Sequence, residues 1–168
     1  MSPLGELLAI DQRSTLEFFV TGLQDVSDGG IDRQELLYNA SVLAHYALVS
    51  TQSTTEMPAP ASLAGVFDHF VLDETVAADG EMLETAAAQC LLLAGFFEDQ
   101  TRRHHNIRWY AQLGASFFIR AAAQQRSPRK AELLTTLAGH FEAWRRRHAR
   151  LGRELRLQPY LLPTPRVS

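Results

Sequence analysis

Apolar residues recur at intervals of three and four along most of the chain, which is the period of an amphipathic α-helix. The clearest case is the C-terminal third, where alternating steps of three and four form a heptad seam over about three heptads. The seam consists of Leu134, Leu137, Phe141, Trp144, His148, Leu151 and Leu155. Ser127 and Pro128 supply an N-cap and a first-turn proline. The pattern therefore predicts one long helix from residue 128 to about residue 157.

Capping residues and helix stops divide the rest of the chain into further helices. Asp32, with Glu35 three residues later, can cap one helix, and Asn106 can cap another. With the apolar spacing, these signals predict helices over about 14–26, 32–50, 63–70, 79–97 and 106–122. No stretch alternates as a strand does. We therefore expect an all-α fold, a compact bundle of five to seven helices with a long C-terminal helix.

Length and composition fit one globular domain. The 168 residues are 46% hydrophobic and 21% charged, which suffices for a core without disulfide or metal support. We expect a single helical domain over residues 1–157. Residues 158–168 contain three prolines that prevent a helix from continuing, so they should form an extended tail.

The sequence also bears on the compartment. Cys90 is the only cysteine, so no intrachain disulfide can form. The N-terminus lacks the basic region of a signal peptide, and the longest apolar run is shorter than the roughly 20 residues that cross a bilayer. We expect a cytoplasmic protein without membrane insertion.

Charge is distributed unevenly along the chain. Residues 1–100 contain 2 arginines and 16 acidic residues, a net charge of −14, whereas residues 101–156 contain 13 basic and 3 acidic residues, a net charge of +10. Two halves of one domain can complement each other, and the basic half can instead face an anionic partner. We favour complementation within the chain or a mixed solvated surface, since blocks of charge are usually exposed helix faces.

The densest candidate for chemistry is RRHHNIRWY, residues 102–110. Adjacent histidines diverge by about 100° on a helix, and no HExxH, ExxH or Cys/His ladder accompanies them, so we expect no metal and no cofactor. The stretch also suits polyanion binding by the basic half, residues 102–156. The residues of this alternative are Arg102, Arg103, Arg108 and Trp109. Nucleic acid is the less favoured partner, because no known nucleic-acid-binding motif is present.

A third interpretation is a small metal- or ligand-dependent helical enzyme. His148 interrupts the apolar seam, and His140 lies eight residues earlier on roughly the same face, with Trp144 between them. A lone histidine on an apolar face is usually a packed residue. Neither a GxSxG motif nor a glycine-rich phosphate loop is present, and the acidic pair Glu98 and Asp99 is typical of a solvated surface. We therefore expect no catalytic residues.

Residues 91–122 resemble a pattern of small uncharacterised bacterial helical proteins: an apolar helix ending in Gly-Phe-Phe, a basic junction, and then Tyr-x-x-x-Gly-x-Ser with an aromatic residue. The matching positions are Gly95, Phe96, Phe97, Tyr110, Gly114, Ser116 and Phe117. The resemblance carries no known activity. It implies that the junction turns between two packed core helices, with Trp109 and Tyr110 facing inward and the arginines solvated.

From these observations we expect a non-enzymatic protein-interaction or regulatory module of a bacterial cell. It would act by docking against another protein or a second copy of itself. The candidate partner-binding residues are Arg146, Arg150, Arg153, Tyr160, Leu161 and Leu162. The last three are apolar anchors on a proline-stiffened segment, which reduces the ordering cost of binding.

Overall fold

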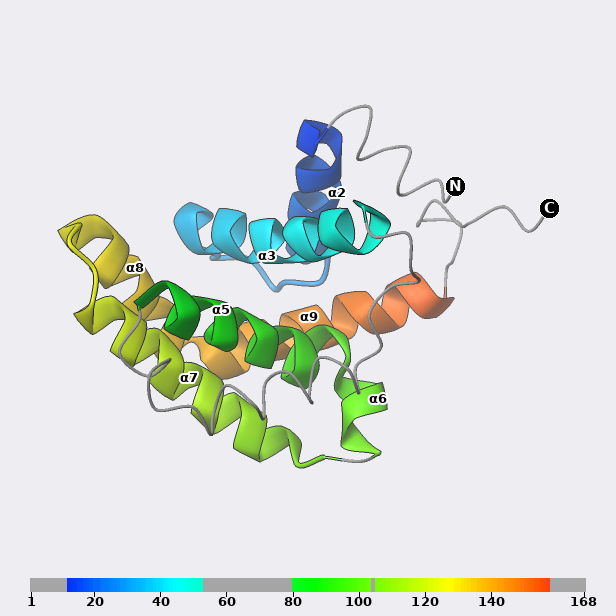
Figure 1. Cartoon of the computed structure of the whole chain (residues 1–168). Coiled ribbons are helices and arrows are strands. Elements are labelled where there is room, and N and C mark those ends of the chain that lie inside the picture. Colours follow the sequence, from blue (N-terminus) through cyan, green and yellow to red (C-terminus); the bar gives the residue numbers. More distant parts are fainter. Residues whose placement is uncertain (1–11, 53–79, 104, 158–168) are drawn as a thin grey trace. The chain divides into compact units, whose positions relative to one another are not determined.

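A computed structural model describes residues 12–52, 80–103 and 105–157, and every regular element in those ranges is helical (Figure 1). In chain order the elements are α2 (Gln12–Asp25), α3 (Arg33–Gln52), α5 (Gly80–Leu91), the π-helical turn η2 (Leu92–Phe96), α6 (Glu98–Arg102), α7 (Ile107–Ala123), α8 (Pro128–Gly139) and α9 (Phe141–Leu157). The all-α prediction is confirmed for these ranges, which hold seven α-helices and no strand. None of the helices described is long and apolar enough to cross a bilayer.

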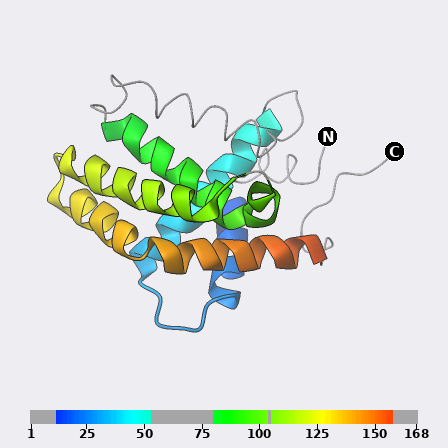
Figure 2. The same cartoon turned by 90° about the horizontal axis from the view of Figure 1, so that it is seen from below.

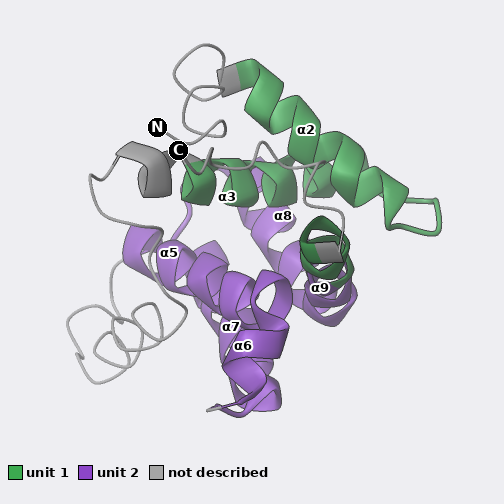
Figure 3. Cartoon of the chain, turned by 90° about the vertical axis from the view of Figure 1, so that its right-hand side faces the viewer, with its two compact units in different colours: residues 1–58, 150–168 green, residues 59–149 purple. Residues whose placement is uncertain are grey.

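The chain forms two units, coloured separately in Figure 3. Unit 1 comprises Met1–Pro58 and Arg150–Ser168, and unit 2 comprises Ala59–Ala149, so α9 contributes residues to both. The single-domain boundary at residue 157 stays a prediction. The tail at 158–168 and the helix predicted near 63–70 lie outside the described residues.

In unit 1, α2 packs against α3. The chain turns between these helices at Gly29 and Gly30, whose φ angles of +91° and +69° are readily adopted only without a Cβ atom. The predicted cap of α3 is confirmed, because the Glu35 backbone N–H donates to Asp32 Oδ2 over 3.1 Å. The turn and the cap therefore follow directly from the local sequence.

In unit 2, α7 contacts α5 and α8 (Figures 1 and 2). Apolar residues at helical spacing along α5 and η2 form one stripe, which is buried throughout and consists of Leu83, Ala87, Cys90, Ala94 and Phe97. Burial raises the pKa of the Cys90 thiol well above its ordinary value, so this cysteine stays protonated. It is a small core residue, as the sequence indicates.

The single long helix predicted over residues 128–157 is wrong, because α8 ends at Gly139 and α9 begins at Phe141. A glycine in a helix interior costs about 1 kcal/mol relative to alanine, and His140 leaves helical geometry with φ −102° and ψ 15°. Both helices remain hydrogen-bonded to His140, since His140 N–H donates to the Thr136 carbonyl over 2.9 Å and Trp144 N–H donates to the His140 carbonyl over 3.0 Å. The apolar seam of α8 therefore continues on the same side of α9, and all seven of its residues are buried.

Two glycines let helices of unit 2 approach closely. The small residues Gly114 and Ala115 predict a close approach of α7 to the stretch containing Ala94 and Gly95. The structure differs, because a Cβ atom on Gly114 would lie 2.7 Å from Cys90 Cβ and 2.5 Å from Phe141 Cζ. On Gly95 it would lie 2.8 Å from His148 Cβ. The absence of a side chain at Gly114 therefore lets α7 pack closely against α5 and α9. The absence of a side chain at Gly95 lets η2 pack closely against α9.

We expect Gly114→Ala to lower the free energy of unfolding by about 1 to 3 kcal/mol, because the new methyl group overlaps packed atoms of α5 and α9. Gly139→Ala is the matched control, since its Cβ atom would meet nothing within 4 Å. Alanine there should leave stability unchanged or raise it by up to about 1 kcal/mol. Urea denaturation of both variants measures the difference, and equal stabilities would contradict the close approach.

Candidate functional site

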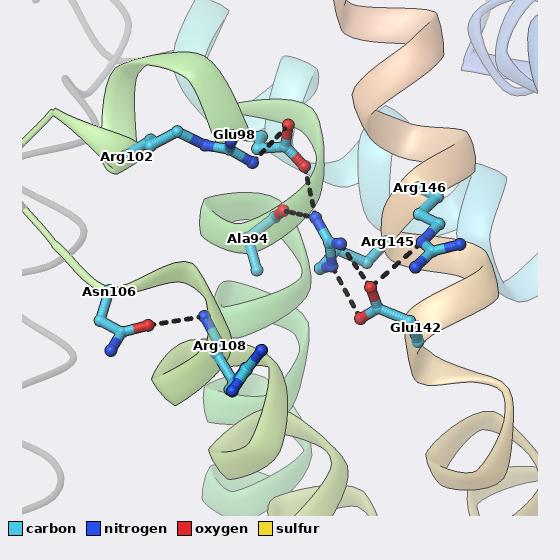
Figure 4. Close-up of polar contacts among 8 residues, drawn as sticks. All are labelled: Ala94, Glu98, Arg102, Asn106, Arg108, Glu142, Arg145 and Arg146. Carbon is cyan, nitrogen blue, oxygen red and sulfur yellow. Dashed lines mark hydrogen bonds and ion pairs between the residues drawn. The ribbon is translucent and has the colours of Figure 1, made fainter.

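The arginine-rich junction at 102–110 connects α6 to α7. Asn106 caps α7 as predicted: its Oδ1 accepts the backbone N–H of Arg108 over 2.9 Å (Figure 4). It also accepts the backbone N–H of Trp109 over 3.4 Å. The Tyr110 hydroxyl lies 3.4 Å from Nδ1 of His105. Tyr110 is buried as the resemblance implies, whereas the inward prediction for Trp109 is wrong, since that residue is 43% exposed. The cap fixes the start of α7 and leaves the indole ring in contact with solvent.

A buried ion pair joins this region to α9. The Arg145 side chain is only 10% exposed, and its guanidinium lies between the carboxylates of Glu98 and Glu142 (Figure 4). Arg145 donates to Glu98 Oε2 and Glu142 Oε1, and its Nε donates to Glu142 Oε2 over 2.9 Å. Its Nη1 also donates to the Ala94 carbonyl over 3.1 Å. The expectation that Glu98 is a solvated surface acid is therefore wrong, because it is buried as the partner of an arginine 47 residues later.

The Arg145 ion pair is structural rather than available to a ligand. The hydrogen bond from Arg145 is the main cause that lowers the pKa of Glu142, and the Glu142 and Glu98 carboxylates raise the pKa of Arg145 against the opposing effect of burial. Glu142 and Arg145 are therefore both charged near neutral pH. Their donors and acceptors are directed at one another, which removes one arginine of the basic half from any partner-binding role.

The solvent side of α7 has a different character. We call it the α7 face, and it comprises the exposed residues Arg108, Trp109, Gln112, Ser116, Ile119 and Arg120. At about 100° per residue these positions fall within an arc of about 120°. Ile119 is 56% exposed and Trp109 is 43% exposed, so both residues place large apolar side chains in contact with solvent. The face therefore combines two arginines with two exposed apolar residues.

No acidic residue occurs between Asp99 and Glu132, and seven basic residues lie in this interval. All seven are exposed. Two of them pair with acids of the same unit: Arg102 Nη2 lies 3.1 Å from Glu98 Oε1, and Lys130 Nζ lies 3.0 Å from Glu84 Oε1. Four others form no ion pair with any residue that the structure describes, namely Arg103, Arg108, Arg126 and Arg129. Pairing within the chain therefore offsets the positive charge near both ends of α7 only in part.

The arginines first favoured for partner binding lie on α9 and are exposed: Arg146, Arg150 and Arg153. Arg146 Nε lies 3.2 Å from Glu142 Oε1, and Arg150 Nη1 lies 3.9 Å from Asp28 Oδ1 in unit 1. These two already face acids of their own chain. The three apolar anchors Tyr160, Leu161 and Leu162 lie outside the described residues.

The structure does not bring the three residues of the ligand-pocket interpretation to one accessible place. His140 is exposed at the end of α8, whereas Trp144 and His148 are buried in the core. Burial lowers the pKa of His148 to about 3, so its ring is neutral at physiological pH. Arg147 covers the Trp144 ring, with Cζ 4.5 Å from the ring centroid. Among the residues described, no group of three or more His, Cys, Asp or Glu side chains is arranged to hold a metal ion.

Sequence reasoning missed Ile119 as a candidate binding residue. The signal was its position eleven residues after Arg108, about three turns later on the same side of the helix. Neighbouring Phe117 and Phe118 are buried, and they made Ile119 resemble a further core residue. Comparison with models of known protein families, with curated proteins and with solved structures finds no match for this chain.

Proposed function

We propose that this chain is a non-enzymatic binding module that docks a partner protein on the α7 face. The observation that carries the proposal is the exposure of Trp109 and Ile119 on a helix face that has arginines and no acidic residue. Contact of two large apolar side chains with water is unfavourable, and a docked protein would remove it. The function is therefore binding through a preformed surface rather than chemistry.

The composition of the α7 face supports a protein partner. Protein interfaces are enriched in Trp, other aromatic residues and Arg, and they are depleted in Lys, Asp and Glu. Tryptophan and arginine also supply most of the strongly contributing interface residues. The α7 face contains Trp109, Arg108 and Arg120 and none of the depleted charged residues. The arginines of α9 become a secondary surface, because Arg146 and Arg150 already face acids.

Photo-crosslinking in the native host tests the proposal. Ser116 is exposed on the α7 face, and we expect p-benzoylphenylalanine placed there to form a crosslink to a discrete polypeptide. Ser41 is the control position, an exposed serine of α3 that should give no such product. If position 116 gives only uncrosslinked protein, or the same products as position 41, the docking function is wrong.

Polyanion binding by the basic half is the second candidate. The observation in its favour is that Arg103, Arg108, Arg126 and Arg129 form no ion pair with a described residue. Titration with a 20-nucleotide single strand at 50 and 200 mM salt distinguishes the candidates. Four phosphate contacts predict that affinity falls roughly 30- to 50-fold over this range. Docking of a protein predicts no measurable binding of the oligonucleotide at the higher salt concentration.

A further inference from the structure

We infer that the partner of the α7 face is an acidic, amphipathic protein segment that places two apolar residues on Trp109 and Ile119 and carboxylates on the neighbouring arginines. The inference rests on the proposed docking function and adds the chemistry of the partner.

The positive charge of the α7 face requires a partner segment with negative charge. Arg108 and Arg120 are twelve residues apart, which is about 18 Å along the axis of α7. No acidic residue lies between them. Arg103 and Arg126 extend the positive potential beyond both ends of the helix, and neither pairs with an acid that the structure describes. A partner that is neutral or basic along this length would desolvate Arg108, which pairs with no acid that the structure describes, without compensating its charge.

The positions of Trp109 and Ile119 determine how far apart the apolar residues of the partner segment must be. Trp109 and Ile119 are ten residues apart, or about 15 Å along α7, and each directly adjoins an arginine in sequence. The Trp109 ring packs edge-on against the buried Tyr110 ring, with centroids 4.9 Å apart, which holds the indole in position. A helical partner segment would span this distance with about ten residues. It would need an apolar residue near each end and an acidic residue beside each one.

A second copy of the chain fits the α7 face poorly. In a twofold-symmetric dimer the same patch meets itself. Pairing two α7 faces would place arginines against arginines, because the face offers no carboxylate to oppose them, and like charges in an interface are unfavourable.

A nucleic acid is also a poorer fit. Phosphates could satisfy Arg108 and Arg120, and a base could stack on Trp109. Neither group would cover Ile119, which is 56% exposed between the arginines. An exposed aliphatic side chain is best covered by another apolar side chain.

Peptide display with the full-length chain as the target tests this inference. We expect randomised 16-residue peptides selected on the wild-type chain to carry an excess of Asp and Glu and at least two large apolar residues. Synthetic copies should protect Trp109 from acrylamide quenching. The chain has two tryptophans, and Trp144 is buried, so quenching reports mainly on Trp109.

Matched surface variants locate the binding. Arg108→Glu and Ile119→Asp should each weaken the selected peptides at least tenfold. Arg33→Glu on α3 and Met82→Asp on α5 make the same chemical changes at other exposed positions, and affinity should stay within twofold. Selected peptides without acidic excess, peptides that bind Arg108→Glu as tightly as the wild type, or a 20-nucleotide strand that binds as tightly as the peptides would each overturn the inference.

The crosslinking experiment distinguishes a failure of the proposed docking function from a failure of the inferred partner chemistry. If a polypeptide crosslinks to position 116 but no acidic peptide is selected, the docking function stands and the acidic chemistry is wrong. If nothing crosslinks there, the docking function is wrong and the inference falls with it.

Discussion

Replacement of Arg145 by methionine should lower the free energy of unfolding by about 3 kcal/mol, because removal of one partner leaves a buried carboxylate without its main counter-charge. Glu98 would still face the exposed Arg102, 3.1 Å away, and the Ala94 carbonyl would lose a donor. The value lies at the lower end of the usual range for a broken buried pair, since Arg102 still offsets some of the charge on Glu98. Chemical denaturation measures the effect.

Two further variants test whether the loss of stability in Arg145→Met comes from the buried ion pair. Arg146→Met removes the neighbouring arginine, which is exposed and bonds only Glu142 among the described residues, and exposed pairs contribute about 0 to 1 kcal/mol. The double variant Arg145→Met with Glu98→Leu replaces the two buried members of the ion pair by apolar groups, leaves the exposed Glu142 in place, and should recover much of the lost stability. If Arg145→Met and Arg146→Met are equally stable, the ion pair does not stabilise the fold.

Acidification between pH 7.5 and pH 5 should lower the free energy of unfolding by about 2 kcal/mol through His148 alone. Burial lowers the pKa of this histidine to about 3 in the folded chain. The unfolded chain therefore takes up a proton below its ordinary pKa of about 6.5, while the folded chain does not. Stability from this group is complete above that value and falls by about 1.4 kcal/mol per pH unit towards pH 3.

His148→Gln removes the titrating group and should flatten the profile between pH 6.5 and pH 5. His45→Gln is the control, since that histidine is exposed on α3, and its variant should keep the wild-type slope. The interval between pH 6.5 and pH 5 isolates the effect of His148, because carboxylates such as Glu142 titrate at lower pH. An unchanged slope in His148→Gln would show that the ring is protonated in the folded protein.

Local sequence signals predicted much of the fold. The caps at Asp32, Asn106 and Ser127 lie where short-range chemistry places them, because each side-chain oxygen accepts a backbone N–H within three residues. The buried seam of the last two helices follows from its spacing in the same way. These features depend on residues that are close in sequence.

Features that depend on distant residues could not be predicted. The Glu98–Arg145 pair joins residues 47 positions apart, and nothing near Glu98 distinguishes it from a solvated acid. The break at His140 leaves the seam in phase, so the apolar pattern gives no sign of it. Ile119 on the α7 face follows two buried phenylalanines, and only the arrangement of α5, α7 and α8 shows that it faces solvent. The acid-free interval around it was already visible in the sequence.

Native mass spectrometry of the untagged protein, purified gently from its own host, would show whether the chain docks a protein on the α7 face. We expect a stoichiometric complex with a second polypeptide that is lost in Arg108→Glu and kept in Arg33→Glu. If the spectrum instead shows a bound metal, cofactor or nucleic acid, or a complex that survives Arg108→Glu unchanged, docking of a protein on the α7 face is wrong.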